Sequence, residues 1–145
     1  MTEIGLMLDA GAVAFTDCDQ VVEDARILQR ALAYARSLGT LVVGHPQDPN
    51  LSKGAAATSG KFSTMKGLPS VSPIAERIGL ERDIALVEMT SARYHFDQIT
   101  SKNSLGPLKR AKETAVFAAF PLIGLTSACL HLASSIISCV AILSN

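Results

Sequence analysis

Apolar positions in the first hundred residues form two patterns, short continuous runs and longer segments with helical spacing. The runs AVAF (residues 12–15) and TLVVGHP (40–46) have unbroken apolar centres, which is typical of strands buried on both faces. The segment YHFDQIT (94–100) alternates apolar and polar side chains, as a strand with one buried face does. The pattern therefore predicts three strands.

A helical pattern follows each predicted strand. The predicted helices cover residues 21–39, 73 to about 90, and 105–113. Asp19 is a candidate N-cap for the first helix, Gly39 its stop, and Ser72 the N-cap of the second. The stripe expected to face the core in the second helix comprises Ile74, Ile78, Ala85 and Met89. Because strands and helices alternate, we expect an α/β fold with a parallel sheet and right-handed crossovers.

One segment has neither pattern. Residues 47–72 are rich in Ser, Ala, Gly, Lys and Pro and predict a long loop, a kind of segment that is often functional. Within it, GAAATSGKF has a superficial likeness to a phosphate-binding loop. Its glycines are one residue too far apart, no Ser or Thr follows Lys61, and no strand precedes it. A phosphate loop is therefore excluded.

Charge and cysteine content narrow the classes of function. The chain has 13 Lys and Arg and 13 Asp and Glu, so its formal net charge is zero. There is therefore no excess of positive charge that would indicate nucleic acid or an anionic membrane as a partner. The three cysteines form no CxxC pair, which favours a reducing compartment. The start, MTEIGLMLDAG, carries acidic residues and no basic region, unlike a signal peptide. We therefore expect a cytoplasmic protein.

The last part of the chain differs from the rest. Every charged residue lies between Glu3 and Glu113, and none occurs from Thr114 to Asn145. This predicts two units, a body at 1–113 and an apolar tail at 114–145. Three interpretations of the tail stay open: a shifted reading frame, a membrane segment over residues 115–143, or an interface helix.

Polar side chains follow the predicted strands. Asp17 and Cys18 come after the first strand, His45 ends the second, and His95 lies on the third. Chemistry in parallel α/β proteins collects beyond the carboxyl ends of strands, where these residues would converge. Carboxylate oxygen, thiolate sulfur and imidazole nitrogen are all zinc ligands. The sequence therefore indicates a candidate metal site.

Each candidate also has an ordinary structural role open to it. Asp17 or Asp19 could cap the following helix, and Cys18 could be an inert buried thiol. His45 precedes a proline and could be a turn residue, while His95 could be a core histidine. A hydrolase centre built from Cys18, His45 and an Asp is a further alternative, although no local signature supports it.

Four stretches in succession resemble a known family. IGLMLDAGAVAFTDCD, LVVGHPQDPNL, GLPSVSPIAERIGLERDIAL and RYHFDQIT resemble the middle of dihydroorotase, an amidohydrolase-superfamily enzyme of pyrimidine synthesis. The resemblance covers about residues 3–113. It implies part of a (β/α)8 TIM-type barrel, about strands 4 to 6 with their helices, followed by the uncharged tail.

The resemblance also implies a chemistry. Dihydroorotases hydrolyse or close the cyclic amide of dihydroorotate with zinc and an activated water. His45 matches the family's histidine ligand after the fifth strand. Cys18 aligns with a carboxylate ligand after the fourth strand, beside a matching Asp17, and Gln98 aligns with a histidine ligand on the sixth. The metal candidates are thus His45, Cys18 and Asp17, zinc is the expected cofactor, and no catalytic residue is assigned.

The departures from the family pattern suggest a chain that is catalytically impaired by itself. Its implied small molecules are dihydroorotate and carbamoyl aspartate. The alternative function is a non-catalytic scaffold that partners aspartate carbamoyltransferase. Open strand edges in a partial barrel also favour self-association. The loop from Asn50 to Gly67 is expected to lie over the substrate side.

Overall fold

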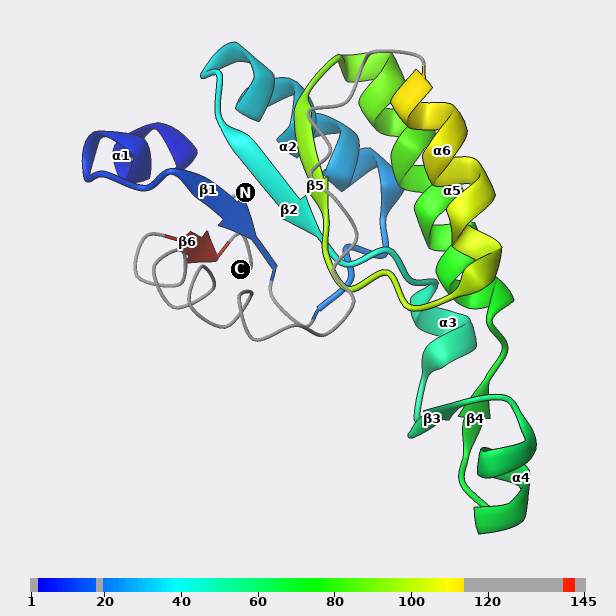
Figure 1. Ribbon diagram of the computed structural model, residues 1–145. Coiled ribbons are helices and arrows are strands. Elements are labelled where there is room, and N and C mark those ends of the chain that lie inside the picture. The colour runs from blue at the N-terminus through cyan, green and yellow to red at the C-terminus, as the bar shows by residue number, and fades with distance from the viewer. Residues whose placement is uncertain (1–2, 18–19, 114–139, 143–145) are drawn as a thin grey trace, which may run out of the picture.

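The computed structural model describes residues 3–17, 20–113 and 140–142 (Figure 1). Four strands form one sheet in the order β5-β2-β1-β6, and every neighbouring pair is parallel. The strands are β1 (Ala14–Thr16), β2 (Leu41–Gly44), β5 (Arg93–Phe96) and β6 (Val140–Ile142). The predicted α/β class with a parallel sheet is confirmed, with the strands shorter than predicted.

Helices lie along the body in the expected alternation. They are α1 (Ile4–Asp9), α2 (Ala25–Ser37), α5 (Ile74–Thr90), the 3₁₀ turn η1 (Lys102–Ser104) and α6 (Leu105–Glu113). Helices α2, α5 and α6 gather on one side of the strands β2 and β5 (Figure 1). The third predicted helix matches α6 at both ends.

The core lies between that side of the sheet and the helices. Phe15, Val42 and Tyr94 stand in register across β1, β2 and β5, and each is almost fully buried. The main core cluster comprises Leu28, Leu32, Ala35, Val42, Leu80, Val87, Ala92, Tyr94, Phe96 and Leu108. By strand alternation, Thr16, Val43 and His95 lie in register on the opposite face.

Helix α2 begins later than predicted. Asp24 is its N-cap and accepts a hydrogen bond from the Arg26 backbone N–H at 2.7 Å. The expected cap, Asp19, lies outside the described residues. The apolar residues Val21 and Val22 extended the helical pattern backwards in the sequence, but the Asp24 side chain caps the first turn three residues further on.

Helix α5 occupies the predicted range but presents a different face. Ile74, Ile78 and Met89 of the predicted stripe are 42%, 44% and 59% exposed. The buried positions are Ala75, Gly79, Leu80, Asp83 and Val87. Gly79 explains the rotation, because a Cβ there would lie 2.5 Å from the Gln47 backbone nitrogen. The inner face is selected by the close approach of Gly79 to the Gln47 backbone and by the hydrogen-bonded carboxylate of Asp83. The spacing of apolar residues does not select it.

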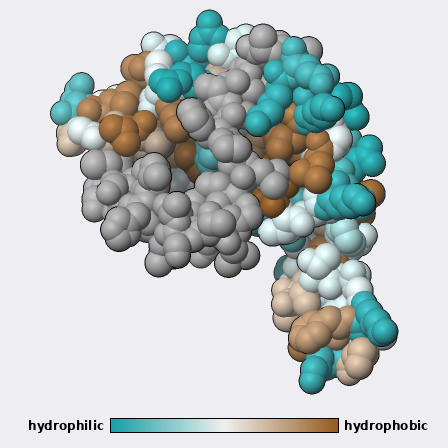
Figure 2. Space-filling view, viewed as in Figure 1, coloured by the Kyte–Doolittle hydropathy of each residue, from teal (hydrophilic) through white to brown (hydrophobic). Residues whose placement is uncertain are grey.

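The segment predicted as a long loop contains four short elements. They are α3 (Pro49–Ser52), β3 (Ala57–Thr58), α4 (Lys61–Lys66) and β4 (Ser70–Val71). We call residues 49–71 the arm. It projects from the body and stands apart from it in the space-filling view (Figures 1 and 2). Local bonds shape it, since Asp48 accepts from the N–H groups of Asn50 and Leu51 and Gly67 ends α4 in the left-handed region.

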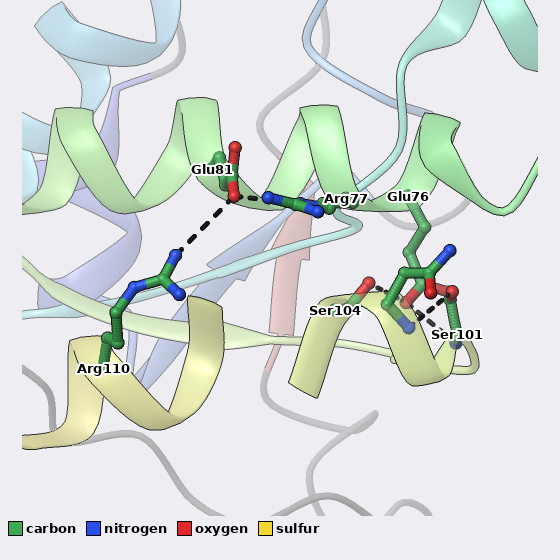
Figure 3. Close-up of polar contacts among 7 residues, drawn as sticks. Glu76, Arg77, Glu81, Ser101, Ser104 and Arg110 are labelled. Atoms are coloured by element: carbon green, nitrogen blue, oxygen red, sulfur yellow. Dashed lines mark hydrogen bonds and ion pairs between the residues drawn. The ribbon is translucent and has the colours of Figure 1, made fainter. Parts of the chain in front are cut away.

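A polar seam joins α5 to the segment after β5 (Figure 3). Glu76 accepts hydrogen bonds from Thr100, Ser101 and Ser104 at 2.5 to 3.0 Å. Burial would raise the pKa of Glu76, but these hydrogen bonds outweigh it and lower the pKa below its ordinary value. One turn on, Glu81 pairs with Arg77 at 3.0 Å and faces Arg110 at 3.8 Å.

The tail hypotheses fall mostly on residues 114–139 and 143–145, which lie outside the described residues. The described stretch of the tail is β6, which pairs with β1. Among the helices that the structure describes, none combines the length and apolar character needed to span a bilayer.

Candidate functional site

The candidate residues lie where the parallel strands end. Asp17 follows β1 directly and His45 follows β2 directly. Because β1 and β2 are neighbours in register, their carboxyl ends lie side by side. The two side chains line one small cavity with a volume of about 20 Å³, room for about one water-sized group. The structure thus brings Asp17 and His45 to one cavity, and their role as metal ligands stays a prediction.

Asp17 carries an unsatisfied atom. Its Oδ1 is buried and has no hydrogen-bond partner among the residues that the structure describes. Burial raises the pKa of the Asp17 carboxyl above its ordinary value. A buried acceptor without a donor is costly to the folded state, so this oxygen is poised to take a proton, a cation or a donor group.

His45 is held by a neighbour in its own turn. The Nε2 atom of His45 lies 3.0 Å from Oε1 of Gln47, a pair in which the imidazole N–H donates to the amide oxygen. This bond leaves Nδ1 as the ring atom with a free lone pair in the neutral form. The buried Pro46 fixes the backbone between the two residues.

A buried polar network underlies the same cavity. The Tyr94 hydroxyl donates to Asp83 Oδ2 at 3.0 Å, and the Arg82 guanidinium contacts Asp83 Oδ1 at 2.8 Å. Arg82 also donates to the Val22 carbonyl at 2.9 Å, which ties α5 to the segment before α2. The residues of this network, Arg82, Asp83 and Tyr94, line the same cavity as His45 and the end of β2.

The charges in the network are shifted by burial. Burial raises the pKa of Asp83, opposed by the charge and hydrogen bond of Arg82. Burial, together with the Asp83 carboxylate, raises the pKa of Tyr94 well above its ordinary value. Tyr94 therefore stays neutral and serves as a hydrogen-bond donor.

Sequence reasoning missed this network. Its clearest signal is Gly44 in VVGHP, because a Cβ at that position would overlap the Tyr94 hydroxyl. A glycine at the end of an apolar strand marks a close approach of another group. The adjacent Arg82 and Asp83 in a helix gave a second, weaker signal.

Among the described residues, the candidates His95 and Gln98 do not line this cavity. His95 is half-buried on β5, where burial lowers its pKa and the Asp97 carboxylate opposes the shift. Strand β5 ends at Phe96, and Gln98 is exposed with a positive φ of 48°. The predicted continuation of the strand to Thr100 was therefore wrong, because the chain turns at Gln98. Cys18 lies outside the described residues.

The metal hypothesis can be tested against the donors present. Across residues 3–17, 20–113 and 140–142, no three His, Cys, Asp or Glu side chains are grouped to hold a metal ion. A catalytic zinc commonly takes three protein ligands. Asp17 and His45 therefore fit one corner of a zinc site and not a complete set.

Residues 1–104 match the model of the family described as Dihydro-orotase-like. A dihydroorotase from Pelotomaculum thermopropionicum is 40% identical over 116 residues, which cover 80% of this chain and 27% of the relative. A dihydroorotase from Wolbachia sp. subsp. Drosophila simulans is 39% identical over 114 residues, covering 78% of this chain and 26% of the relative. The chain thus spans about a quarter of the length of these relatives.

Solved structures agree at the level of the fold. A D-hydantoinase superposes with a TM-score of 0.64 at 22% identity, covering 81% of this chain and 27% of that one. The D-hydantoinase (dihydropyrimidinase) from Thermus sp. gives 0.60 at 19% identity, covering 81% and 28%. Such a likeness shows that the α/β fold with a parallel sheet is shared with part of these structures. The chain belongs to the dihydro-orotase-like family.

Proposed function

We propose that this chain carries one metal-binding corner of a dihydroorotase-type active site, on what would be strands 4 to 6 of the barrel. In this proposal Asp17 and His45 are zinc donors, and Cys18 between Asp17 and Asp19 is a third. The 145 residues by themselves do not turn over dihydroorotate or carbamoyl aspartate.

One observation carries the donor assignment. The buried Oδ1 of Asp17 has no partner in the described part of the chain, and Asp17 lines the same cavity as His45. A cation there would satisfy the oxygen, and its binding would displace the proton that the raised pKa of Asp17 favours. When zinc is bound in such a site, it supplies an activated water and polarises the substrate carbonyl.

A second observation supports the impaired activity. Gln98 occupies the position that the resemblance assigns to a ligand of the sixth strand, and it is exposed beyond the end of β5. A neutral amide is a weak zinc ligand compared with imidazole. The donors in the described part of the chain are therefore insufficient for the family's chemistry.

Zinc binding and turnover test the proposal together. Zinc affinity of the full chain is measured by competition with a chromophoric chelator, for the wild type, Asp17→Asn, His45→Ala and Cys18→Ser. Each substitution should weaken zinc binding more than about tenfold. That is the smallest effect expected from loss of an outer-shell partner, and these residues are proposed to be direct ligands. His95→Ala is the matched control, because His95 lies on β5 and does not line the cavity. Equal affinity in all variants would refute the donor assignment.

The same zinc-loaded samples are assayed for dihydroorotate hydrolysis. We expect no rate above the uncatalysed reaction. A zinc-dependent rate that disappears in His45→Ala would show a complete site and overturn the proposal of impaired activity, while leaving the donor assignment intact.

The alternative is a non-catalytic scaffold that supports aspartate carbamoyltransferase, and its supporting feature is an amide, Gln98, at a position that the resemblance assigns to a metal ligand. Co-purification of the two proteins, or a changed carbamoyltransferase rate, is the expected result.

We further propose that residues 1–113 form the dihydroorotase-like body and 114–145 a separate tail. The family match ends at residue 104, and the last charged residue is Glu113.

A further inference from the structure

Charge is separated between two ends of the body. Residues 1–25 contain six acidic side chains and no basic one, since the first cation is Arg26. The arm, residues 49–71, contains three lysines and no acidic side chain. The chain as a whole has no net charge, so mutual repulsion does not oppose contact between copies.

The tip of the arm is apolar as well as basic. Phe62 is 68% exposed and Met65 is 75% exposed, although both are large hydrophobic residues. They stand three residues apart on α4, between Lys61 and Lys66 at its two ends. Figure 2 shows apolar atoms flanked by hydrophilic ones at this tip. The surface combines an apolar centre with two cations.

Helix α1 has the opposite arrangement. Leu6 is 67% exposed and lies three residues from both Glu3 and Asp9, which are exposed acids. Neighbours at this spacing share one side of a helix. The surface therefore combines an apolar centre with two anions. Its charge is opposite to that of the arm tip, and both surfaces have an apolar centre.

The two surfaces lie at opposite ends of the molecule (Figure 1). An arm therefore meets an α1 surface only on another copy. We propose that the arm of one copy docks on helix α1 of a second copy. The proposed contact residues are Lys61, Phe62, Met65 and Lys66 on the arm and Glu3, Leu6 and Asp9 on α1.

Such a contact is head-to-tail, because it joins two different surfaces. A pair joined in this way keeps one free arm and one free α1, so further copies can add until the assembly closes into a ring. Exposed ion pairs contribute modestly and are screened by salt, while the apolar centre is not screened in this way. The assembly is therefore concentration-dependent and weakens with salt.

Charge reversal provides the test, with sedimentation velocity of the full chain as the measurement. The wild type should grow in sedimentation coefficient with concentration at low salt, and less so at about 1 M salt, where the screening length is about 3 Å. Lys61→Glu with Lys66→Glu should stay monomeric, as should Glu3→Lys with Asp9→Lys. A mixture of the two double variants should associate again, because each supplies the surface that the other has lost.

The matched control for the arm variant is Lys109→Glu with Lys112→Glu on α6, which changes the net charge by the same amount at exposed positions outside the arm. It should associate like the wild type. Circular dichroism confirms that each variant is folded. The proposal is overturned by a monomeric wild type at all concentrations, by a mixture that fails to associate, or by loss of association in the control. Arm-dependent binding of the wild-type monomer to anionic vesicles would assign the arm to lipid instead.

These outcomes are separate from those of the proposed function. None of the seven contact residues lines the cavity of Asp17 and His45. The charge-reversal variants should therefore bind zinc as the wild type does, whichever way the sedimentation experiment turns out.

Discussion

The body and the arm of this chain both contain large apolar residues but use them in opposite ways. Phe15 on β1 in the body is fully buried, while Phe62 in the arm is 68% exposed. The body is stabilised by burial of such side chains, each worth roughly 1.5 to 3 kcal/mol. The arm obtains little of that stabilisation.

Local hydrogen bonds hold the arm in shape instead. Asp48 caps α3, and the Ser63 hydroxyl both donates to the Gly60 carbonyl and accepts from the Gly60 N–H, at 2.9 Å each. Segments with few buried apolar contacts open at a lower free energy than the core. The comparison teaches that an apolar residue in this sequence indicates a core position in one region and a contact surface in the other.

The largest test of the comparison is Phe15→Ala. The substitution removes a fully buried ring from β1, so the free energy of unfolding should fall by about 3 to 5 kcal/mol. Urea denaturation followed by circular dichroism measures it. A loss below about 1 kcal/mol would mean that β1 is not part of the cooperative core.

Gly44→Ala should have the next largest effect. The new Cβ would overlap the Tyr94 hydroxyl, which is fixed by its bond to Asp83, so we expect a loss of about 1 to 3 kcal/mol. Gly60→Ala in the arm is the matched control, because its backbone is extended and nothing lies within 4 Å of the added Cβ. Equal effects at both positions would contradict the contrast between packed body and open arm.

Much of the body could be predicted from the sequence, because hydrophobic periodicity is a local signal. It located strands at β1, β2 and β5 and helices at α2, α5 and α6. It chose the wrong face of α5, since the inner face there holds Gly79 and Asp83 and depends on the backbone of Gln47 and on Tyr94. Such contacts join residues far apart in the chain, and periodicity carries no information about them.

The arm and the site show two further limits. Turn chemistry, visible in Asp48, Gly60 and Gly67, creates short elements that lack any hydrophobic period, so they were predicted as a loop. The position of Asp17 and His45 at one cavity was predictable, because neighbouring parallel strands end at one edge of the sheet. The polar network at that cavity was not, since its groups are recognisable only once Arg82, Asp83 and Tyr94 are brought together.

A pH-dependent test concerns the seam that joins α5 to the segment after β5. Glu76→Gln weakens hydrogen bonds to Thr100, Ser101 and Ser104 and should cost about 1 kcal/mol at neutral pH. Since the folded-state pKa of Glu76 is lowered, its stabilisation is present above its ordinary pKa of 4.5 and is lost as pH falls through the folded value. The difference between wild type and variant should therefore shrink on acidification. A difference that grows below that pH would reverse the sign of the argument.

The smallest expected change in stability is that of Phe62→Ala. The ring is mostly exposed on the arm, so its removal should alter the free energy of unfolding by less than about 0.5 kcal/mol. The same substitution should reduce self-association in sedimentation velocity, because it deletes the apolar centre of the proposed contact. Comparing Phe15→Ala with Phe62→Ala then separates two roles of phenylalanine in this chain. The role of Phe15 in the core is measured by unfolding, and the role of Phe62 in the contact is measured by assembly. A large loss of stability in Phe62→Ala would place the arm inside the folding core, and unchanged association would remove Phe62 from the contact.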